Sequence, residues 1–142
     1  MRYKILISIF VLFLFSCKKD KYTTAPQLKY KSVNTKTLQR GETLQITLSF
    51  TDAEGDLTDS MTVQKIVKAC PDRSNSSFTQ LYKIPTFPTS KNQSGNIVVT
   101  YSYNDINPIC NRNDTAVFKF VLKDQAKNKS DTAVSDPIVI IQ

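Results

Sequence analysis

The sequence predicts an all-β protein: one antiparallel sandwich of seven strands that follows an export signal and a short polar tether. Two patterns predict this class. Apolar and polar residues alternate with a period of two in several short segments, and turn residues separate those segments without a helical stripe between them. The chain has 142 residues, 40% of them hydrophobic, which is enough for one compact domain.

Seven segments have the length and composition of strands. The clearest is Thr43–Thr51, where Leu44, Ile46, Leu48 and Phe50 alternate with polar residues. Glycine-containing turns such as Glu54-Gly55 separate the segments. The expected strands are Gln27–Val33, Thr43–Thr51, Met61–Ala69, Phe78–Ile84, Asn96–Tyr103, Thr115–Lys123 and Pro137–Ile141. Strands of this number and spacing favour two sheets packed face to face.

Composition excludes several classes of function. The chain contains no His, so Ser-His-Asp and Cys-His nucleophiles and His-ligated zinc sites are absent. It carries 19 Lys and Arg against 12 Asp and Glu, a formal charge of +7, but the basic residues beyond the N-terminal region are scattered. A scattered charge of this kind does not track phosphates, so no nucleic-acid partner is expected. Because no nucleophile motif is present and turn carboxylates lack a cleft, we expect no enzymatic activity.

The first segment has the layout of an export signal. Arg2 and Lys4 precede an apolar run, Ile5 to Phe15, that only Ser8 interrupts. The run is too short for a helix that must cross a bilayer, which needs about 20 apolar residues. The protein is therefore expected to be exported, and any attachment to a membrane needs a different anchor.

The end of this signal supplies a candidate anchor. The stretch Leu14-Phe15-Ser16-Cys17 resembles a bacterial lipobox, which implies acylation of Cys17 and cleavage just before it. The start of the mature chain, Cys-Lys-Lys-Asp, looks like that of Bacteroidetes lipoproteins. Several acyl chains hold a protein stably, whereas a single chain does not. We expect attachment to the membrane of the cell envelope, specifically the outer membrane, with its inner or outer face left open. An ordinary secretory peptide cut nearby is the alternative.

Three regions follow from this layout. Residues 1–16 form the lipoprotein signal peptide, residues 17–25 the acylated cysteine and a flexible polar tether, and residues 26–142 the β-sandwich domain.

The two remaining cysteines test the strand order. In an up-and-down alternation of seven strands, Cys70 and Cys110 fall at the same end of the sandwich. An exported protein meets an oxidising compartment, so we expect them to form a disulfide. Such a bond would stabilise the domain by roughly 4 kcal/mol in the loop-entropy description. The alternative, a redox or metal-binding pair, lacks a CxxC spacing.

Two motifs resemble bacterial immunoglobulin-like modules, including cadherin-like ones: residues 48–57, a strand with an acidic turn, and residues 120–130, a strand with an Asp-x-x-x-Asn turn. The resemblance implies an immunoglobulin-like sandwich and, because matching acidic positions hold calcium in several such modules, a calcium site. Asp52, Glu54 and Asp56 have the spacing of alternating oxygen donors. Because successive strands run in opposite directions, turns that follow the second and the sixth expected strand lie at the same end of the domain (strand parity). This turn is therefore expected beside Asp124 and Asp131. The alternative is an acidic turn that only contacts solvent.

Three triplets look like the Asp-Ser/Thr-apolar sites at which Bacteroidetes exported proteins are O-glycosylated. They centre on Ser60, Thr115 and Thr132. We therefore treat these three hydroxyls as candidate modification sites.

These observations predict a lipid-anchored, non-catalytic module of the cell envelope with a structural or accessory role. The alternative is a surface module that binds a glycan or an envelope protein. It would do so through loops that point away from the membrane, namely Asn34–Glu42, Pro71–Ser77 and Asn104–Asp114.

Overall fold

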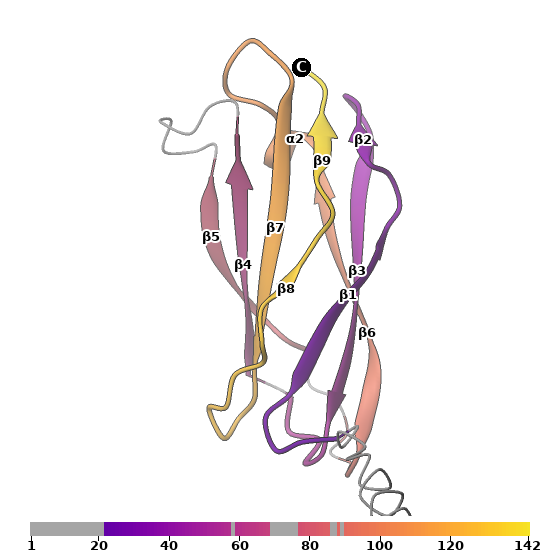
Figure 1. The fold of residues 1–142 in the computed structure, drawn as a ribbon, viewed down its shortest axis with the longest axis vertical. Helices are drawn as coiled ribbons and strands as arrows, with labels where there is room; N and C mark the ends of the chain where they lie inside the picture. The colour runs from indigo at the N-terminus through magenta and orange to yellow at the C-terminus, as the bar shows by residue number, and fades with distance from the viewer. Residues whose placement is uncertain (1–21, 58, 69–76, 86–87, 89) are drawn as a thin grey trace, which may run out of the picture.

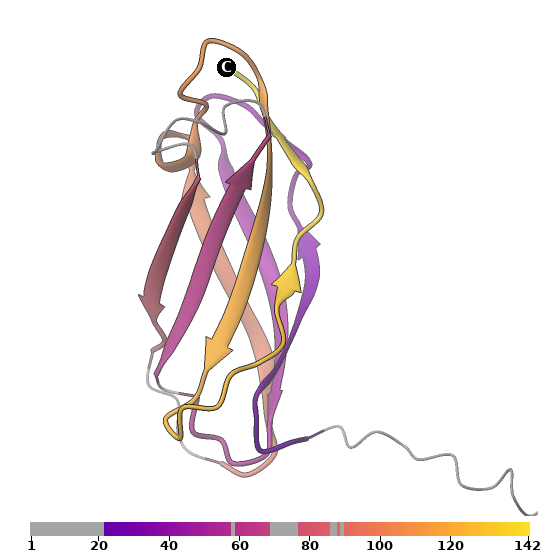
Figure 2. The same ribbon diagram turned by 60° about the vertical axis from the view of Figure 1, so that its left-hand side comes forward.

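The protein folds as two β-sheets packed face to face (Figure 1). The structure, a computed structural model, describes residues 22–57, 59–68, 77–85, 88 and 90–142. One sheet has the order β1-β3-β6, and the other has the order β2-β9-β7-β4-β5, with β8 added beside β7. Figure 2 shows the two layers from the side, with their strands running roughly along the long axis.

All seven expected segments form strands, and two further short strands and one helical turn accompany them. The strands are β1 (Gln27–Val33), β2 (Thr37–Leu38), β3 (Thr43–Asp52), β4 (Ser60–Val67), β5 (Phe78–Lys83), β6 (Gln93–Ser102), β7 (Asp114–Lys123), β8 (Ala133–Val134) and β9 (Ile138–Ile140). The helical turn is α2 (Tyr103–Ile106). The described part of the chain therefore contains nine strands where the sequence pattern predicted seven.

The two additions extend the second sheet. β2 pairs in parallel with β9, and β8 pairs antiparallel with β7. Each has only two residues, so a period of two leaves no recognisable pattern in the sequence.

The helical turn corrects one expected boundary, because Tyr103 was assigned to a strand and instead begins α2. The Asp105 carboxylate accepts hydrogen bonds from the backbone N–H of Ser102 at 2.9 Å and from its hydroxyl at 2.7 Å. These bonds fix the helix start, as in a capping box. The turn buries Tyr103 and Ile106 against the end of the sandwich.

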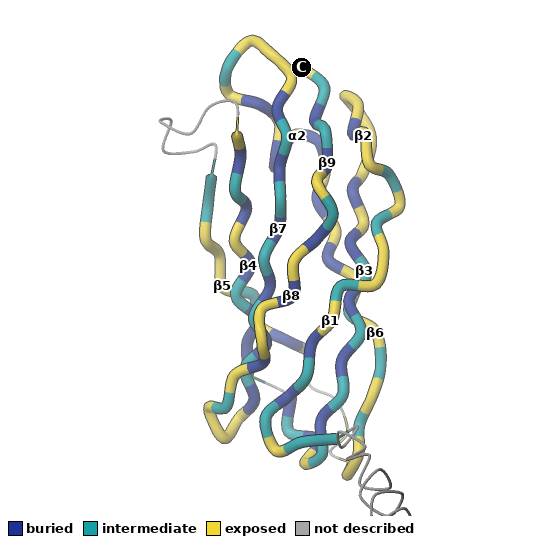
Figure 3. Tube along the Cα trace, in the orientation of Figure 1, coloured by how far each residue is buried: buried dark blue, intermediate teal, exposed yellow. Residues whose placement is uncertain are grey.

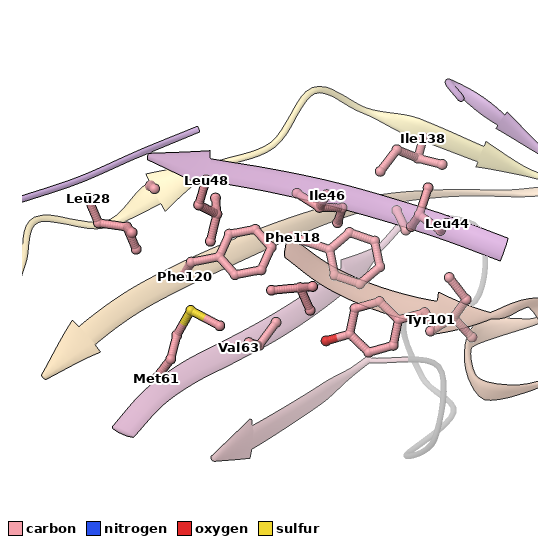
Figure 4. Packing of buried hydrophobic residues seen from close by; sticks show 14 of the residues in the cluster. Leu28, Leu44, Ile46, Leu48, Met61, Val63, Tyr101, Phe118, Phe120 and Ile138 are labelled. Atoms are coloured by element: carbon pink, nitrogen blue, oxygen red, sulfur yellow. The ribbon is translucent and has the colours of Figure 1, made fainter. Parts of the chain in front are cut away.

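Buried residues alternate with more exposed ones along the long strands (Figure 3). The buried side chains of both sheets form one hydrophobic core. Leu44, Ile46 and Leu48 of β3 are fully buried opposite Phe118 and Phe120 of β7. Figure 4 shows this interior, where the Phe118 ring lies between Phe120 and Tyr101. Burial of these side chains, at about 25 cal/mol per Å² of apolar surface, provides the main force that holds the sheets together.

The sandwich has two ends with different roles. We call the end where β1 begins and where β3 and β7 finish the tether pole, because the N-terminal segment joins the domain there (Figures 1 and 2). The opposite end, where β4 and β6 finish and β7 begins, is the far pole. The expected placement of the acidic turns at one end of the domain is confirmed, since they lie together at the tether pole.

Candidate functional site: a buried carboxylate cluster

Three carboxylates meet at the tether pole, between the ends of the two sheets. Asp52 is the last residue of β3, Asp56 lies in the turn that follows, and Asp124 comes directly after β7. One oxygen of each carboxylate lies within 4.8 Å of the others. Asp52 and Asp124 are fully buried, with 0% of their surface exposed, and Asp56 is half-buried. We call these three residues the carboxylate cluster.

The turn after β3 is folded around the Asp52 side chain. Its Oδ2 accepts hydrogen bonds from the backbone N–H of Gly55 at 2.6 Å and of Asp56 at 3.2 Å. Gly55 has a positive φ of 72°, and a Cβ at this position would lie 2.0 Å from the backbone oxygen of Ser90. Only glycine fits both conditions, so the sequence Asp-Gly-Asp at 52, 55 and 56 positions two carboxylates on one side of the turn.

A second turn holds Asp124 against the cluster. Both oxygens of its carboxylate accept hydrogen bonds from Asn128, one from the backbone N–H at 2.7 Å and one from the side-chain amide at 2.9 Å. The two turns are also joined directly, because the N–H of Gln125 donates to the Asp56 carbonyl at 3.1 Å. These bonds hold the two turns, and with them the three carboxylates, close together.

Two oxygens of the cluster have no hydrogen-bond partner. These are Oδ1 of Asp52 and Oδ1 of Asp56, both buried. The side-chain oxygen of Gln93 is a third such atom, and Gln93 lies opposite Asp52 in the β3–β6 register. Buried polar atoms are nearly always bonded, so these acceptors call for a partner, which is either a hydrogen-bond donor such as water or a cation.

No basic side chain supplies that partner within the described residues. The nearest lysines on the sequence, Lys123 and Lys127, contact Asp59 instead, at 3.3 and 3.1 Å. Burial raises the pKa of the Asp52 carboxyl above its usual value, the N–H groups of Gly55 and Asp56 oppose this rise, and the neighbouring Asp56 and Asp124 carboxylates add to it. The ionised cluster is therefore electrostatically unfavourable when it stands alone.

This donor set fits a hard divalent cation. Ca²⁺ prefers carboxylate and carbonyl oxygens, and the cluster offers three carboxylates, with Gln93 on the strand opposite Asp52. A bound cation would neutralise the repulsion and give the unpartnered oxygens a ligand.

The structure revises the ligands expected from the sequence. Asp52 and Asp56 belong to the cluster, and Asp124 joins them from the other sheet as strand parity predicts. Glu54 is exposed on the outside of its turn, and Asp131 is also exposed, so neither is a member. Sequence patterns gave no indication of Gln93, because its place opposite Asp52 depends on the pairing of β3 with β6.

The expected anchor lies outside the described residues. Cys17 and the signal peptide fall in the range 1–21, so acylation stays a prediction. Among the residues that the structure does describe, there is no helix with the length and apolar character needed to cross a membrane. Residues 22–25 of the expected tether are described and lie at the tether pole, beside the carboxylate cluster.

The cysteine pair is tested only in part. Cys70 lies outside the described residues, so its bond with Cys110 also stays a prediction. Their neighbours in sequence are close, since the N–H of Lys68 donates to the Thr115 carbonyl at 3.2 Å. This contact brings the end of β4 to the start of β7, which supports the strand order from which the pairing was inferred.

The three candidate glycosylation sites differ in accessibility. Ser60 is buried at the start of β4, Thr115 is half-buried within β7, and Thr132 is exposed. Of the three hydroxyls, that of Thr132 is the one that the folded domain presents to solvent.

Comparisons with known proteins identify a fold and no family. No protein-family model and no curated protein matches the chain. The sporulation control protein Spo0M from Bacillus subtilis matches with a TM-score of 0.51 and 14% identity, over 84% of this chain and 51% of Spo0M. The chain thus spans about half the length of Spo0M.

Two smaller solved modules also match. A CARDB domain from Pyrococcus furiosus, solved in complex with di-metal ions, has a TM-score of 0.36 and 7% identity, over 89% of this chain and 98% of that domain. A cohesin module from a Clostridium perfringens family 33 glycoside hydrolase has a TM-score of 0.34 and 13% identity, over 84% of this chain and 98% of the module. The two layers described above, in which the long strands pair antiparallel, form a β-sandwich of the immunoglobulin-like kind.

Proposed function

We propose that the protein is a lipid-anchored, non-catalytic module of the bacterial cell envelope that binds one calcium ion in its carboxylate cluster. The observation that supports the cation most strongly is the Oδ1 atom of Asp52. It belongs to a side chain with no exposed surface, it has no hydrogen-bond partner, and one oxygen of that side chain lies within 4.8 Å of an oxygen of each of Asp56 and Asp124. A buried charge in this setting destabilises the fold unless a partner compensates it.

The chemistry of the donors favours calcium over other metals. All the available side-chain donors are oxygens, and the chain has no His, so soft or borderline metals lack their usual ligands. Magnesium requires near-ideal octahedral geometry, whereas calcium accepts six to eight oxygens in flexible arrangements. Asp52, Asp56, Asp124 and Gln93 would supply part of such a shell, and water would complete it.

The anchor rests on the sequence around Cys17. The export signal and the lipobox resemblance support acylation, and the domain begins at the tether pole only a few residues later. In this arrangement the cation site lies at the membrane side of the domain. The far pole, with the connections 34–42 and 107–113, points away from the outer membrane.

The second candidate function is recognition of a glycan or an envelope protein by the far pole. Ile109 favours it, because 38% of this large apolar side chain is exposed within the connection between α2 and β7.

Calorimetric titration of the purified full chain with CaCl₂ tests the cation. We expect heat from one binding site, no comparable heat with MgCl₂, loss of binding in Asp124→Asn, and unchanged binding in the matched control Glu54→Gln. The absence of calcium heat in the wild-type chain, or wild-type binding in Asp124→Asn, would overturn the proposal.

Mass spectrometry of the protein from its native host tests the anchor. We expect a mature chain that starts at Cys17 and carries the mass of acyl groups, and a Cys17→Ala variant that leaves the membrane fraction. A mature chain without acyl mass would overturn this part of the proposal.

A further inference from the structure

We propose that cation binding at the carboxylate cluster controls how firmly residues 22–26, the segment that leads to the anchor, are docked onto the domain. The proposal rests on the proposed calcium site and adds a consequence to it. Calcium binding and the docking of residues 22–26 onto the sandwich would then be coupled. The evidence is a set of backbone contacts that converge on the turn between two cluster residues.

Ala53 is the centre of these contacts. It follows Asp52 directly, its N–H donates to the carbonyl of Thr23 at 3.2 Å, and its carbonyl accepts from the N–H of Asn92 at 2.9 Å. The turn that carries two of the three carboxylates is therefore bonded on one side to the N-terminal segment and on the other to the turn before β6. A shift of Ala53 would break both bonds.

The N-terminal segment is internally organised around Thr23. The Thr23 hydroxyl donates to the carbonyl of Ala25 at 2.6 Å and accepts from the side-chain amide of Gln27 at 3.2 Å. Pro26 is buried. Because Thr23 is bonded to its own neighbours, its contact with Ala53 sets the position of the whole segment rather than of one residue.

The state without a cation works against this contact. Three carboxylates lie with oxygens within 4.8 Å of one another, and two of them belong to the turn around Ala53. Their repulsion favours opening of the turn and acts against the bonds that hold it, which join Ala53 to Thr23 and Asn92 and join Asp56 to the turn after β7. A cation reverses the repulsion, closes the turn and aligns the Ala53 N–H with Thr23.

Linkage makes the coupling reciprocal. If the cation strengthens the docking of the segment, then the docked segment must strengthen cation binding by the same factor. A change at Thr23, which lies outside the carboxylate cluster, is therefore expected to alter calcium affinity. A purely local site would not respond to such a change.

Amide hydrogen exchange followed by NMR on the full chain in detergent tests the first half. At saturating calcium we expect exchange of the Ala53 N–H to slow at least tenfold relative to the chain in EDTA. The control is the Tyr103 N–H at the far pole, which donates to the Glu42 carbonyl at 3.0 Å. Calcium should slow exchange of the Tyr103 N–H by a factor that is at least five times smaller than the factor for the Ala53 N–H.

Calorimetry of Thr23→Gly tests the second half. We expect its calcium affinity to fall three- to tenfold. The matched control is Thr35→Gly, since the Thr35 hydroxyl donates to the carbonyl two residues on, at 2.7 Å, as that of Thr23 does, but in the connection between β1 and β2. The affinity of Thr35→Gly should stay within twofold of wild type.

The outcomes separate this inference from the proposed calcium site. Calcium heat in the wild-type chain with unchanged exchange at Ala53, or with unchanged affinity in Thr23→Gly, would overturn the coupling and leave the site in place. The absence of calcium heat in the wild-type chain would overturn both.

Discussion

Replacement of Asp52 by asparagine should stabilise the cation-free domain while it abolishes stabilisation by calcium. The carboxylate is fully buried, its Oδ1 is unpartnered and two other carboxylates face it. Asparagine keeps an oxygen for the N–H groups of Gly55 and Asp56, and its amide can donate to the neighbouring carboxylates. Asp52→Asn thus removes a charge that the fold does not compensate.

The expected magnitude follows from the desolvation cost of one unsatisfied buried group, about 1–3 kcal/mol. The sign agrees with the pKa. Because burial holds the pKa of folded Asp52 above its usual value, the free energy of unfolding falls as the pH rises through that window. Asparagine does not ionise and avoids this loss. With calcium at 100 times its dissociation constant, the wild-type chain should gain about 2.7 kcal/mol and the variant much less.

Urea unfolding of both proteins in EDTA and in calcium measures these differences. The account predicts that Asp52→Asn is the more stable protein in EDTA and loses this advantage in calcium, while Glu54→Gln follows the wild type in both buffers because Glu54 is exposed. The lower end of the desolvation cost, about 1 kcal/mol, sets the threshold. If Asp52→Asn is less stable than wild type in EDTA by this amount or more, the reasoning is refuted. An equal gain from calcium in both proteins would refute it as well.

Three further predictions concern the scaffold. Gly55→Ala should lower the free energy of unfolding by about 2 kcal/mol or more and abolish calcium binding, because the left-handed turn and the backbone of Ser90 leave no room for a Cβ; urea unfolding and calorimetry measure both. Burial lowers the pKa of Lys65 to about 8 from 10.5. The free energy of unfolding of wild type relative to Lys65→Met should therefore rise between pH 8 and 10, by at most about 1.4 kcal/mol per pH unit. A difference that stays constant across that range in urea unfolding would contradict the burial of Lys65. Loss of the disulfide in Cys70→Ala/Cys110→Ala should reduce stability by roughly 4 kcal/mol, and thiol titration of the unfolded wild-type chain that finds both cysteines reduced would disprove the pairing.

Strands with a long alternating pattern were predictable from the sequence, because their burial depends on parity alone. The bounds of β1 match the expected ones, and β3 extends one residue further, to Asp52. The start of β6 was placed three residues late, since Gln93 to Gly95 contain no apolar alternation and join the strand through their pairing with β3. Helix α2 had a local signal that the prediction did not use, the Ser102…Asp105 pair of a capping box.

The carboxylate cluster was predictable in its location but not in its membership. Strand parity correctly placed Asp52, Asp56 and Asp124 at one end of the domain. Glu54 shares the parity of Asp52 along an extended chain, but the structure leaves it outside the cluster. The backbone leaves the extended conformation after Asp52 and turns at Gly55, so a period of two no longer applies and Glu54 points outward. Gln93 has no motif, and only tertiary pairing reveals it.

A crystal structure of the protein grown in CaCl₂, with anomalous data, tests the central claim most directly. The account predicts a calcium peak bonded to Asp52, Asp56 and Asp124 at about 2.3–2.6 Å. It also predicts that Oδ1 of Asp52, which has no hydrogen-bond partner here, is one of the ligands. Carboxylates that bind only water in the presence of saturating calcium, with no anomalous peak between them, would contradict it.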